Sequence, residues 1–162
     1  MSVYSFINPL LFVLFKLTRK IRLLITNLQL VNSPTYGNLV ELHGEFELIH
    51  PENFSYGDNL SINGGVYINA GSDIVLGKNV SLSAKCMLIT KGLNPKNLSE
   101  HYSKPIRIGS NMQVGAGAIV LPGVSIVSNV IIAAGSVVTK NIEISGVYAG
   151  VPCKKLVIEG IL

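Results

Sequence analysis

The stretch VGAGAIVLPGVSIVSNVIIAAGSVV, residues 114–138, contains no charged residue and repeats an aliphatic residue at every sixth position. An α-helix would place residues six apart on nearly opposite faces. A flat strand has period two and would not need Gly115, Gly117, Gly123 and Gly135. A solenoid of short strands and tight turns satisfies both observations, because glycine and asparagine accept positive φ angles at the corners. Three hexads then make one triangular coil.

The six-residue period extends on both sides of this stretch. It starts at Ile62, Ile68 and Ile74, slips by two residues, and continues at Leu76, Leu82 and Leu88. From Ile108 onward it runs without a gap, and a small, polar or second apolar residue follows four positions after each aliphatic one. The aliphatic set is Ile108, Val114, Val120, Ile126, Ile132 and Val138, and the second set is Met112, Ala118, Val124, Val130 and Ser136.

One long polar segment, KGLNPKNLSEHYSKP at residues 91–105, interrupts the array. Leu88 and Ile108 are separated by twenty residues instead of eighteen, so we expect a loop over residues 90–105 that leaves the solenoid. An insertion in a repeat protein maps to one face and often carries the binding function. This loop holds His101, the only histidine of the repeat region. The alternative is a surface insertion without a role.

The hexads, together with AAGSVVTKNI at 133–142 and AGVPCKK at 149–155, resemble the hexapeptide-repeat acyltransferases. The similarity is to the branch of maltose, galactoside and polysaccharide O-acetyltransferases, and it covers residues 54–156. It implies an all-β, left-handed parallel β-helix that assembles as a homotrimer. It also implies acetyl-coenzyme A (acetyl-CoA) as acyl donor and active sites between neighbouring subunits. The expected acceptor is a sugar hydroxyl of a surface polysaccharide or its precursor.

The coenzyme A contacts follow from small residues and from the resemblance. Small residues at the tight turns let a narrow thioester chain lie against the backbone. By the resemblance, four residues contact coenzyme A: Ala116, Ala134, Thr139 and Lys140. The resemblance also implies that Lys154 lies near the coenzyme phosphates, with Lys155 assisting. For the lysines, the alternative is a solvated cationic tail. The expected cofactor-binding set is Ala116, Gly117, Ala134, Thr139, Lys140, Lys154 and Lys155.

The general base is the main departure from the family pattern, because the expected histidine falls at Leu93. Three explanations stay open: His101 has taken over the role, the alignment is shifted by a few residues, or the protein is a non-catalytic trimeric scaffold. An imidazole suits base chemistry near neutral pH, which favours His101. Gln113 stands where relatives usually have tryptophan, so the type of acceptor is open as well.

Asn63, Asn69 and Asp73 fall in the segment where relatives hold their sugar. They are candidate acceptor ligands, or alternatively ordinary corner residues of the solenoid. His43 and His50 precede the regular repeats and are expected to be edge residues. A zinc site of the related carbonic anhydrases needs three histidines around one site, and of the three in this chain only His101 lies in the repeats, so no metal site is expected.

The N-terminus predicts a helix over residues 1–30, with Asn8 as N-cap and Pro9 in the first turn. Its apolar run at 9–15 is too short to span a membrane. The helix either docks on a partner subunit or lies in a membrane interface with its basic residues toward anionic headgroups. Its apolar stripe is Leu10, Leu14, Leu17, Ile21 and Leu24.

The rest of the chain is expected to form one β-helix domain over residues 31–156 and a tail over 157–162. Cys86 and Cys153 are too few for a disulfide framework, which favours the reducing cytoplasm, with peripheral contact at the inner face of the membrane as an addition. The net charge of +4 permits an anionic partner. Coenzyme A is the anion we expect, and no nucleic acid.

Overall fold

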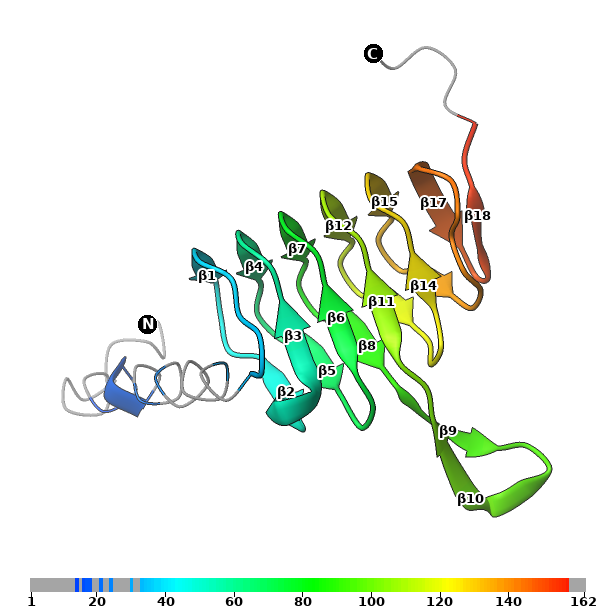
Figure 1. Ribbon diagram of the computed structural model, residues 1–162. Coiled ribbons are helices and arrows are strands. Elements are labelled where there is room, and N and C mark those ends of the chain that lie inside the picture. The colour runs from blue at the N-terminus through cyan, green and yellow to red at the C-terminus, as the bar shows by residue number, and fades with distance from the viewer. Residues whose placement is uncertain are drawn as a thin grey trace, which may run out of the picture.

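The structure is a computed structural model that describes residues 33–157 together with Leu14, residues 16–18, Ile21, Leu24 and Leu30. From Val40 the chain winds into a triangular solenoid whose coils stack along one axis (Figure 1). Each coil gives one strand to each of three sheets, which we name face 1, face 2 and face 3 in chain order. Neighbouring strands within a face are parallel, except for the last pair.

Face 1 consists of β1 (Val40–Leu42), β4 (Leu60–Ile62), β7 (Val80–Leu82), β12 (Met112–Val114), β15 (Val130–Ile132), β17 (Gly146–Gly150) and the antiparallel β18 (Cys153–Lys155). Face 2 consists of β2 (Glu47–Ile49), β5 (Tyr67–Asn69), β8 (Met87–Ile89), β13 (Ile119–Val120) and β16 (Val137–Val138). Face 3 consists of β3 (Phe54–Tyr56), β6 (Ile74–Leu76), β11 (Ile106–Ile108) and β14 (Ser125–Ile126), and the short 3-10 helix η2 (Pro51–Asn53) precedes β3.

The core is the column of side chains inside the triangle. Both sets of hexad residues point into it, and every member from Ile108 to Val138 is buried. In the first coils Phe54 and Leu60 fill the same column and are at most 1% exposed. The predicted period is therefore confirmed as the spacing of inward-facing side chains, because each strand directs alternate residues to opposite sides.

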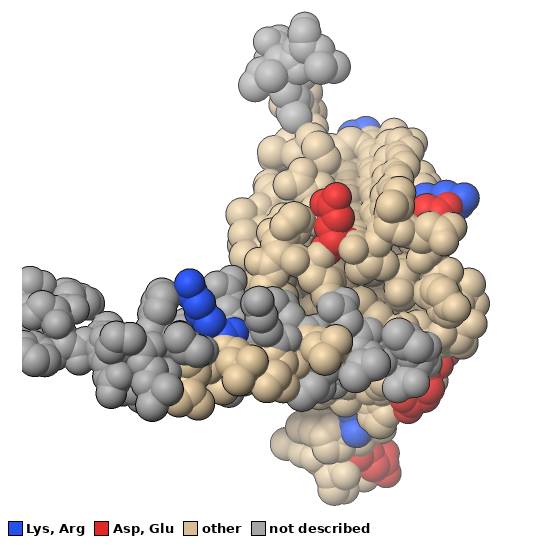
Figure 2. Space-filling model, turned by 90° about the vertical axis from the view of Figure 1, so that its left-hand side faces the viewer, with Lys and Arg blue, Asp and Glu red and all other residues tan. Residues whose placement is uncertain are grey.

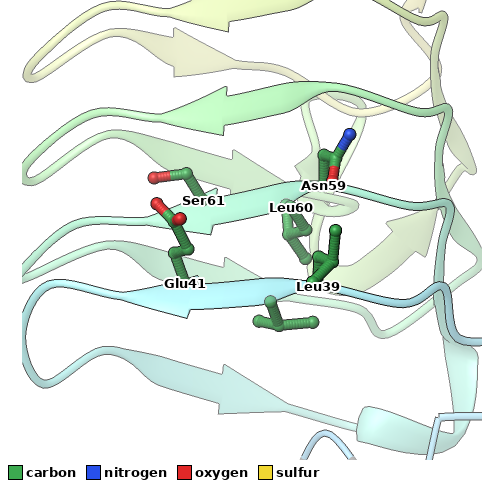
Figure 3. Close-up of a pocket in the computed structure, with 6 residues that line it drawn as sticks. Leu39, Glu41, Asn59, Leu60 and Ser61 are labelled. Carbon is green, nitrogen blue, oxygen red and sulfur yellow. The ribbon is translucent and has the colours of Figure 1, made fainter.

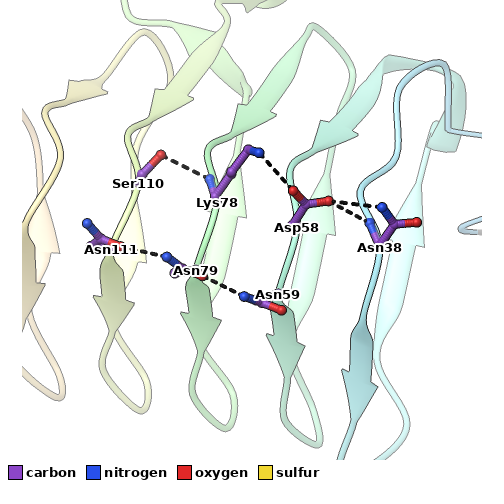
Figure 4. Close-up of polar contacts among 7 residues, drawn as sticks. All are labelled: Asn38, Asp58, Asn59, Lys78, Asn79, Ser110 and Asn111. Carbon is purple, nitrogen blue, oxygen red and sulfur yellow. Dashed lines mark hydrogen bonds and ion pairs between the residues drawn. The ribbon is translucent and has the colours of Figure 1, made fainter.

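The corner between face 3 and face 1 is built on asparagine. Asn59, Asn79, Asn111 and Asn129 all have φ near +60°, a conformation that asparagine tolerates better than most residues. Each of the first three side-chain amides donates to the asparagine on the next coil, at 2.8, 2.8 and 3.0 Å, and Figure 4 shows the first part of this ladder. The ladder pairs polar groups at every turn and thus fixes the stacking of successive coils.

A second polar row runs beside the ladder (Figure 4). Asp58 accepts a hydrogen bond from the Asn38 backbone N–H at 2.9 Å and forms an ion pair with Lys78 at 2.8 Å. Lys78 donates its backbone N–H to the Ser110 hydroxyl at 3.0 Å. The hydrogen bond from Lys78 and those from Asn38 hold the pKa of the Asp58 carboxyl below its usual range.

The described residues of the predicted N-terminal helix are helical, and among them Leu30 is buried against the core. Asn8, Pro9 and Leu10, which the sequence places at the start of that helix, lie outside the described residues.

Candidate active site

The insertion forms a β-hairpin that projects from the corner between face 2 and face 3, called corner 2–3 here (Figure 1). Its strands are β9 (Lys91–Asn94) and β10 (Asn97–Ser103), which pair antiparallel. The expected loop over residues 90–105 is thus an ordered hairpin, named the active-site hairpin below. Its tip is tied by Glu100, which accepts from Asn94 at 3.1 Å and from Asn97 at 2.8 Å.

The stem of the active-site hairpin is fixed to the solenoid by Thr90, which is fully buried. Its hydroxyl donates to the Asn69 carbonyl at 2.8 Å and accepts from the Ser72 N–H at 3.1 Å. The Ser103 hydroxyl donates to the Thr90 carbonyl at 3.3 Å. These bonds hold the base of both hairpin strands against the preceding coil.

His101 lies on β10 directly opposite Leu93 on β9. Residues directly opposite in an antiparallel pair project on the same side of the sheet. The side chain of His101 is exposed, and that of Leu93 is 46% exposed. Leu93, where the resemblance expects a histidine, and His101, the histidine of the hairpin, are therefore cross-strand neighbours.

Part of the expected coenzyme A set lies at the corner between face 1 and face 2, called corner 1–2 here. Ala116 and Gly117 are on one coil and Ala134 is on the next, all three exposed. The Gly135 N–H donates to the Ala116 carbonyl at 2.8 Å, which stacks the two coils. Gly117 and Gly135 have φ of 66° and 68°, and a Cβ added at either would meet nothing within 4 Å. The corner is a smooth backbone surface open to a ligand.

The lysines of β18 lie near the end of the same corner. Lys154 pairs with Ala149 on β17, and the Gly150 N–H donates to the Ser136 hydroxyl at 3.1 Å. This bond ties the end of β17 to corner 1–2. Lys155 lies one residue farther along face 1, opposite Tyr148, and both lysines are exposed.

The remaining expected residues divide between the two corners. Thr139 and Lys140 follow β16 and lie exposed at corner 2–3, the corner that carries the active-site hairpin. Asn69 and Asp73 flank the turn beneath the hairpin stem, where the Asn69 side chain accepts from the Gly71 N–H at 3.3 Å. Asn63 lies at corner 1–2 and donates to the Leu82 carbonyl at 3.2 Å, so the structure separates it from the other two.

Face 2, which lies between the two corners, carries an apolar outer surface. Its strands bury Leu48, Ile68, Leu88, Val120 and Val138 inward. The neighbouring positions alternate to the outside. Apart from Glu47 and Asn69, the outer surface of face 2 is formed by Ile49, Tyr67, Met87, Ile89, Ile119, Leu121 and Val137, all half-buried or exposed.

A histidine–carboxylate pair at corner 2–3 was missed from the sequence. His50 has φ of 61°, and its Nδ1 lies 3.1 Å from Oε1 of Glu52. The hydrogen bond to its own backbone and the one to His50 lower the pKa of the Glu52 carboxyl. The spacing of two residues in HPE was the available signal. His43 forms a looser pair with Glu41 at 3.5 Å.

Two pockets lie on the first coils, away from the expected site residues. One, of about 260 Å³, opens on face 1 between β1 and β4, and Figure 3 shows Glu41 and Ser61 side by side at its rim. The other, of about 440 Å³, lies between Glu45 and Tyr67. Neither is lined by an expected catalytic, cofactor or acceptor residue. Among the described residues, no cluster of His, Cys, Asp and Glu could hold a metal ion.

Solved structures of known proteins share this architecture. No protein-family model matches the chain. A solved maltose O-acetyltransferase from Clostridium difficile superposes with a TM-score of 0.71 at 26% identity over 85% of each chain. A solved galactoside acetyltransferase in complex with coenzyme A gives a TM-score of 0.71 at 32% identity, over 75% of this chain and 63% of that one. The fold is that of the hexapeptide-repeat acetyltransferases.

Curated proteins with similar sequences are named as acetyltransferases too. The galactoside O-acetyltransferase of Escherichia coli K12 is 39% identical over 115 residues, or 64% of this chain and 56% of that protein. The chain thus spans about half the length of the curated relatives it matches. The resemblance and the left-handed parallel β-helix that it implies are both confirmed, and so is the solenoid expected from the hexads.

Proposed function

We propose that the protein is an acetyl-CoA-dependent O-acetyltransferase that acts on a sugar hydroxyl as a homotrimer. One observation carries this proposal: the two halves of the expected site lie on opposite corners of face 2. Corner 1–2 presents the small-residue surface for the thioester, and corner 2–3 presents the active-site hairpin with His101. The relatives named above, which include a coenzyme A complex, support both the donor and the sugar acceptor.

Cyclic assembly would bring the two halves together. If each protomer turns its apolar face 2 toward a threefold axis, that face is buried. The two edges of face 2, corner 1–2 and corner 2–3, then each lie against a neighbouring protomer. The rotation then places corner 1–2 of one protomer against corner 2–3 of the next, because a closed ring uses two different surfaces at each contact. Each trimer would hold three such grooves. Thr139 and Lys140 would reach the coenzyme from the subunit that supplies the hairpin.

In the proposed reaction, the acceptor hydroxyl attacks the thioester carbonyl carbon of acetyl-CoA. His101 takes the hydroxyl proton, and backbone N–H groups at the tight turns stabilise the oxyanion of the tetrahedral intermediate. The carbon–sulfur bond then breaks, and the departing thiolate takes up the proton to give free coenzyme A and the acetyl ester. Asn69 and Asp73 would hold the acceptor, since they lie beneath the hairpin that carries the base.

The pairing of His101 with Leu93 supports His101 as the base. An imidazole on β10 leaves the hairpin on the same side as a side chain on β9 at position 93. A base moved across the hairpin would therefore act on the same groove. We propose that Lys154 and Lys155 bind the coenzyme phosphates, and that Asn63, on the other corner, has a structural role through its bond to Leu82.

We further propose that the acceptor is a surface polysaccharide or its precursor, and that the enzyme works in the cytoplasm. Acetyl-CoA as donor and two free cysteines support this location.

The test compares His101→Ala with His50→Ala, a second exposed histidine at the same corner. Acetyl transfer from acetyl-CoA is measured across a panel of sugars, and coenzyme A binding by thermal shift. We expect His101→Ala to lower turnover roughly 100- to 10,000-fold with unchanged coenzyme binding, the usual effect of losing a positioned base. Loss in His50→Ala alone would move the base to the His50–Glu52 pair. Failure of the native protein to bind coenzyme A would support the non-catalytic scaffold.

A further inference from the structure

The N-terminal helix exposes an apolar stripe. Leu14, Leu17, Ile21 and Leu24 are helical, and their exposed fractions are 48%, 54%, 47% and 60%. Their spacing of three and four residues places them on one side of the helix. In Figure 2 uncharged side chains of this segment lie at the surface beside the first coil of the solenoid. Leu30, at the other end, is buried and anchors the helix to the core.

The charge of the chain is concentrated in the same helix. Residues 1–40 contain Lys16, Arg19, Lys20 and Arg22 and no acidic residue. The other nine basic residues of the chain are balanced by its nine acidic residues, all at position 41 or later. The whole net charge of +4 therefore belongs to residues 16–22. Along the sequence these four residues alternate with the stripe residues between Leu14 and Leu24.

An apolar stripe within a strongly basic segment matches the chemistry of an anionic lipid surface. The apolar side chains enter the boundary between headgroups and acyl chains, while Lys and Arg remain at the headgroups. An apolar protein partner of the same stripe would not explain why all of the net charge lies within the same segment, residues 16–22. A one-sided apolar stripe fits a helix that lies parallel to the surface. No helix among the described residues is long and apolar enough to cross a bilayer.

We infer that the N-terminal helix binds the protein to anionic membrane surfaces. In the proposed trimer three such helices would act together, which multiplies weak individual affinities. A membrane-bound enzyme would meet lipid-linked sugar precursors at the same surface. This last point rests on the proposed function, whereas membrane binding itself does not.

The experiment measures co-sedimentation of the full chain with vesicles of phosphatidylcholine alone and with vesicles that also contain phosphatidylglycerol. Arg19→Gln/Arg22→Gln removes two charges from the helix, and Lys85→Gln/Lys96→Gln removes two exposed charges elsewhere as the matched control. Each basic residue near an anionic surface strengthens binding about fivefold, so the helix variant should bind about 30-fold more weakly per helix, and by more where several helices of one trimer bind together. The control should lose much less.

A second variant, Leu17→Asn/Ile21→Asn, should weaken binding at high salt, where the electrostatic part is screened. Light scattering is measured on each variant in parallel. The inference is overturned if the full chain binds neither vesicle, if both charge variants lose affinity equally, or if the Leu17→Asn/Ile21→Asn change alters the molecular mass in solution. The last result would show that a second copy covers the stripe. Since vesicle binding needs no acetyl transfer, failure here leaves the enzymatic proposal intact.

Discussion

Gly117→Ala separates the role of corner 1–2 in folding from its role in binding. Gly117 has φ of 66°, where an L-residue costs about 1–2 kcal/mol. An added Cβ meets nothing within 4 Å, so no steric term is added in the free protein. For a chain of this size the expected loss is a few degrees in melting temperature, at about 2–4 °C per kcal/mol.

Binding should suffer separately, because the added methyl group would occupy the surface on which the pantetheine arm is proposed to lie. Overpacking of a close contact costs typically about 1–3 kcal/mol, which corresponds to roughly a 5- to 150-fold rise in Kd for coenzyme A. Isothermal titration calorimetry measures this Kd, and thermal unfolding without ligand measures the strain.

Gly65→Ala is the matched control. Gly65 lies at the same corner, with φ of 75°, on a coil away from the expected cofactor residues. Its added Cβ would meet Lys85 alone, at 3.0 Å from the flexible side chain and at 3.9 Å from the backbone. It should lose similar stability and keep coenzyme A affinity. Equal affinity loss in both variants, or none in Gly117→Ala, would refute the binding role of this corner.

Three further predictions concern stability and thiol chemistry. The hydrogen bond from Lys78 is the main reason that the pKa of Asp58 is lowered in the folded state. The Asp58 carboxylate therefore stabilises the fold above pH about 4, and this stabilisation is lost as the pH falls further. The difference in melting temperature between the native protein and Asp58→Asn should close on acidification. Burial raises the pKa of Cys86 to about 12, so iodoacetamide should label the partly exposed Cys153 first and Cys86 only on unfolding; comparable native labelling of both would contradict the buried position. Leu88→Ala, at a fully buried site, should cost about 2–5 kcal/mol in denaturant unfolding, and a neutral result would contradict the core assignment.

The hexad pattern was enough to predict the fold and most of the core, because inward-facing positions of a solenoid repeat at a fixed spacing. It also located the insertion, since the hairpin of residues 91–103 cannot fit the repeat. The Lys104 N–H donates to the Thr90 carbonyl, and these two residues mark the ends of the hairpin at corner 2–3. The repeat says which residues are corners and which are strands. It does not say how side chains on different coils meet.

The candidate site shows this limit. The cross-strand pairing of His101 with Leu93 depends on the hairpin register, which a bulge in the pairing shifts and which no local motif specifies. Asn63 and Asn69 are one hexad apart in the sequence and therefore lie on successive corners, so they cannot share a ligand on one corner. The His50–Glu52 pair arises from the left-handed conformation of His50 before η2, and a simple count of histidines overlooks it.

The central claim is that corner 1–2 of one protomer and the active-site hairpin of the next form one site, and mixed trimers test it directly. His101→Ala and Gly117→Ala proteins are unfolded together, refolded as a mixture and assayed for acetyl transfer at limiting acetyl-CoA. If the site is shared, a groove is intact when its hairpin comes from a Gly117→Ala chain and its corner 1–2 comes from a His101→Ala chain. Random mixing gives this combination in about one quarter of the grooves, so activity should recover to about a quarter of the native value. If each chain held a whole site, every site would carry one defect, and the mixture would stay at the mean of its two parents.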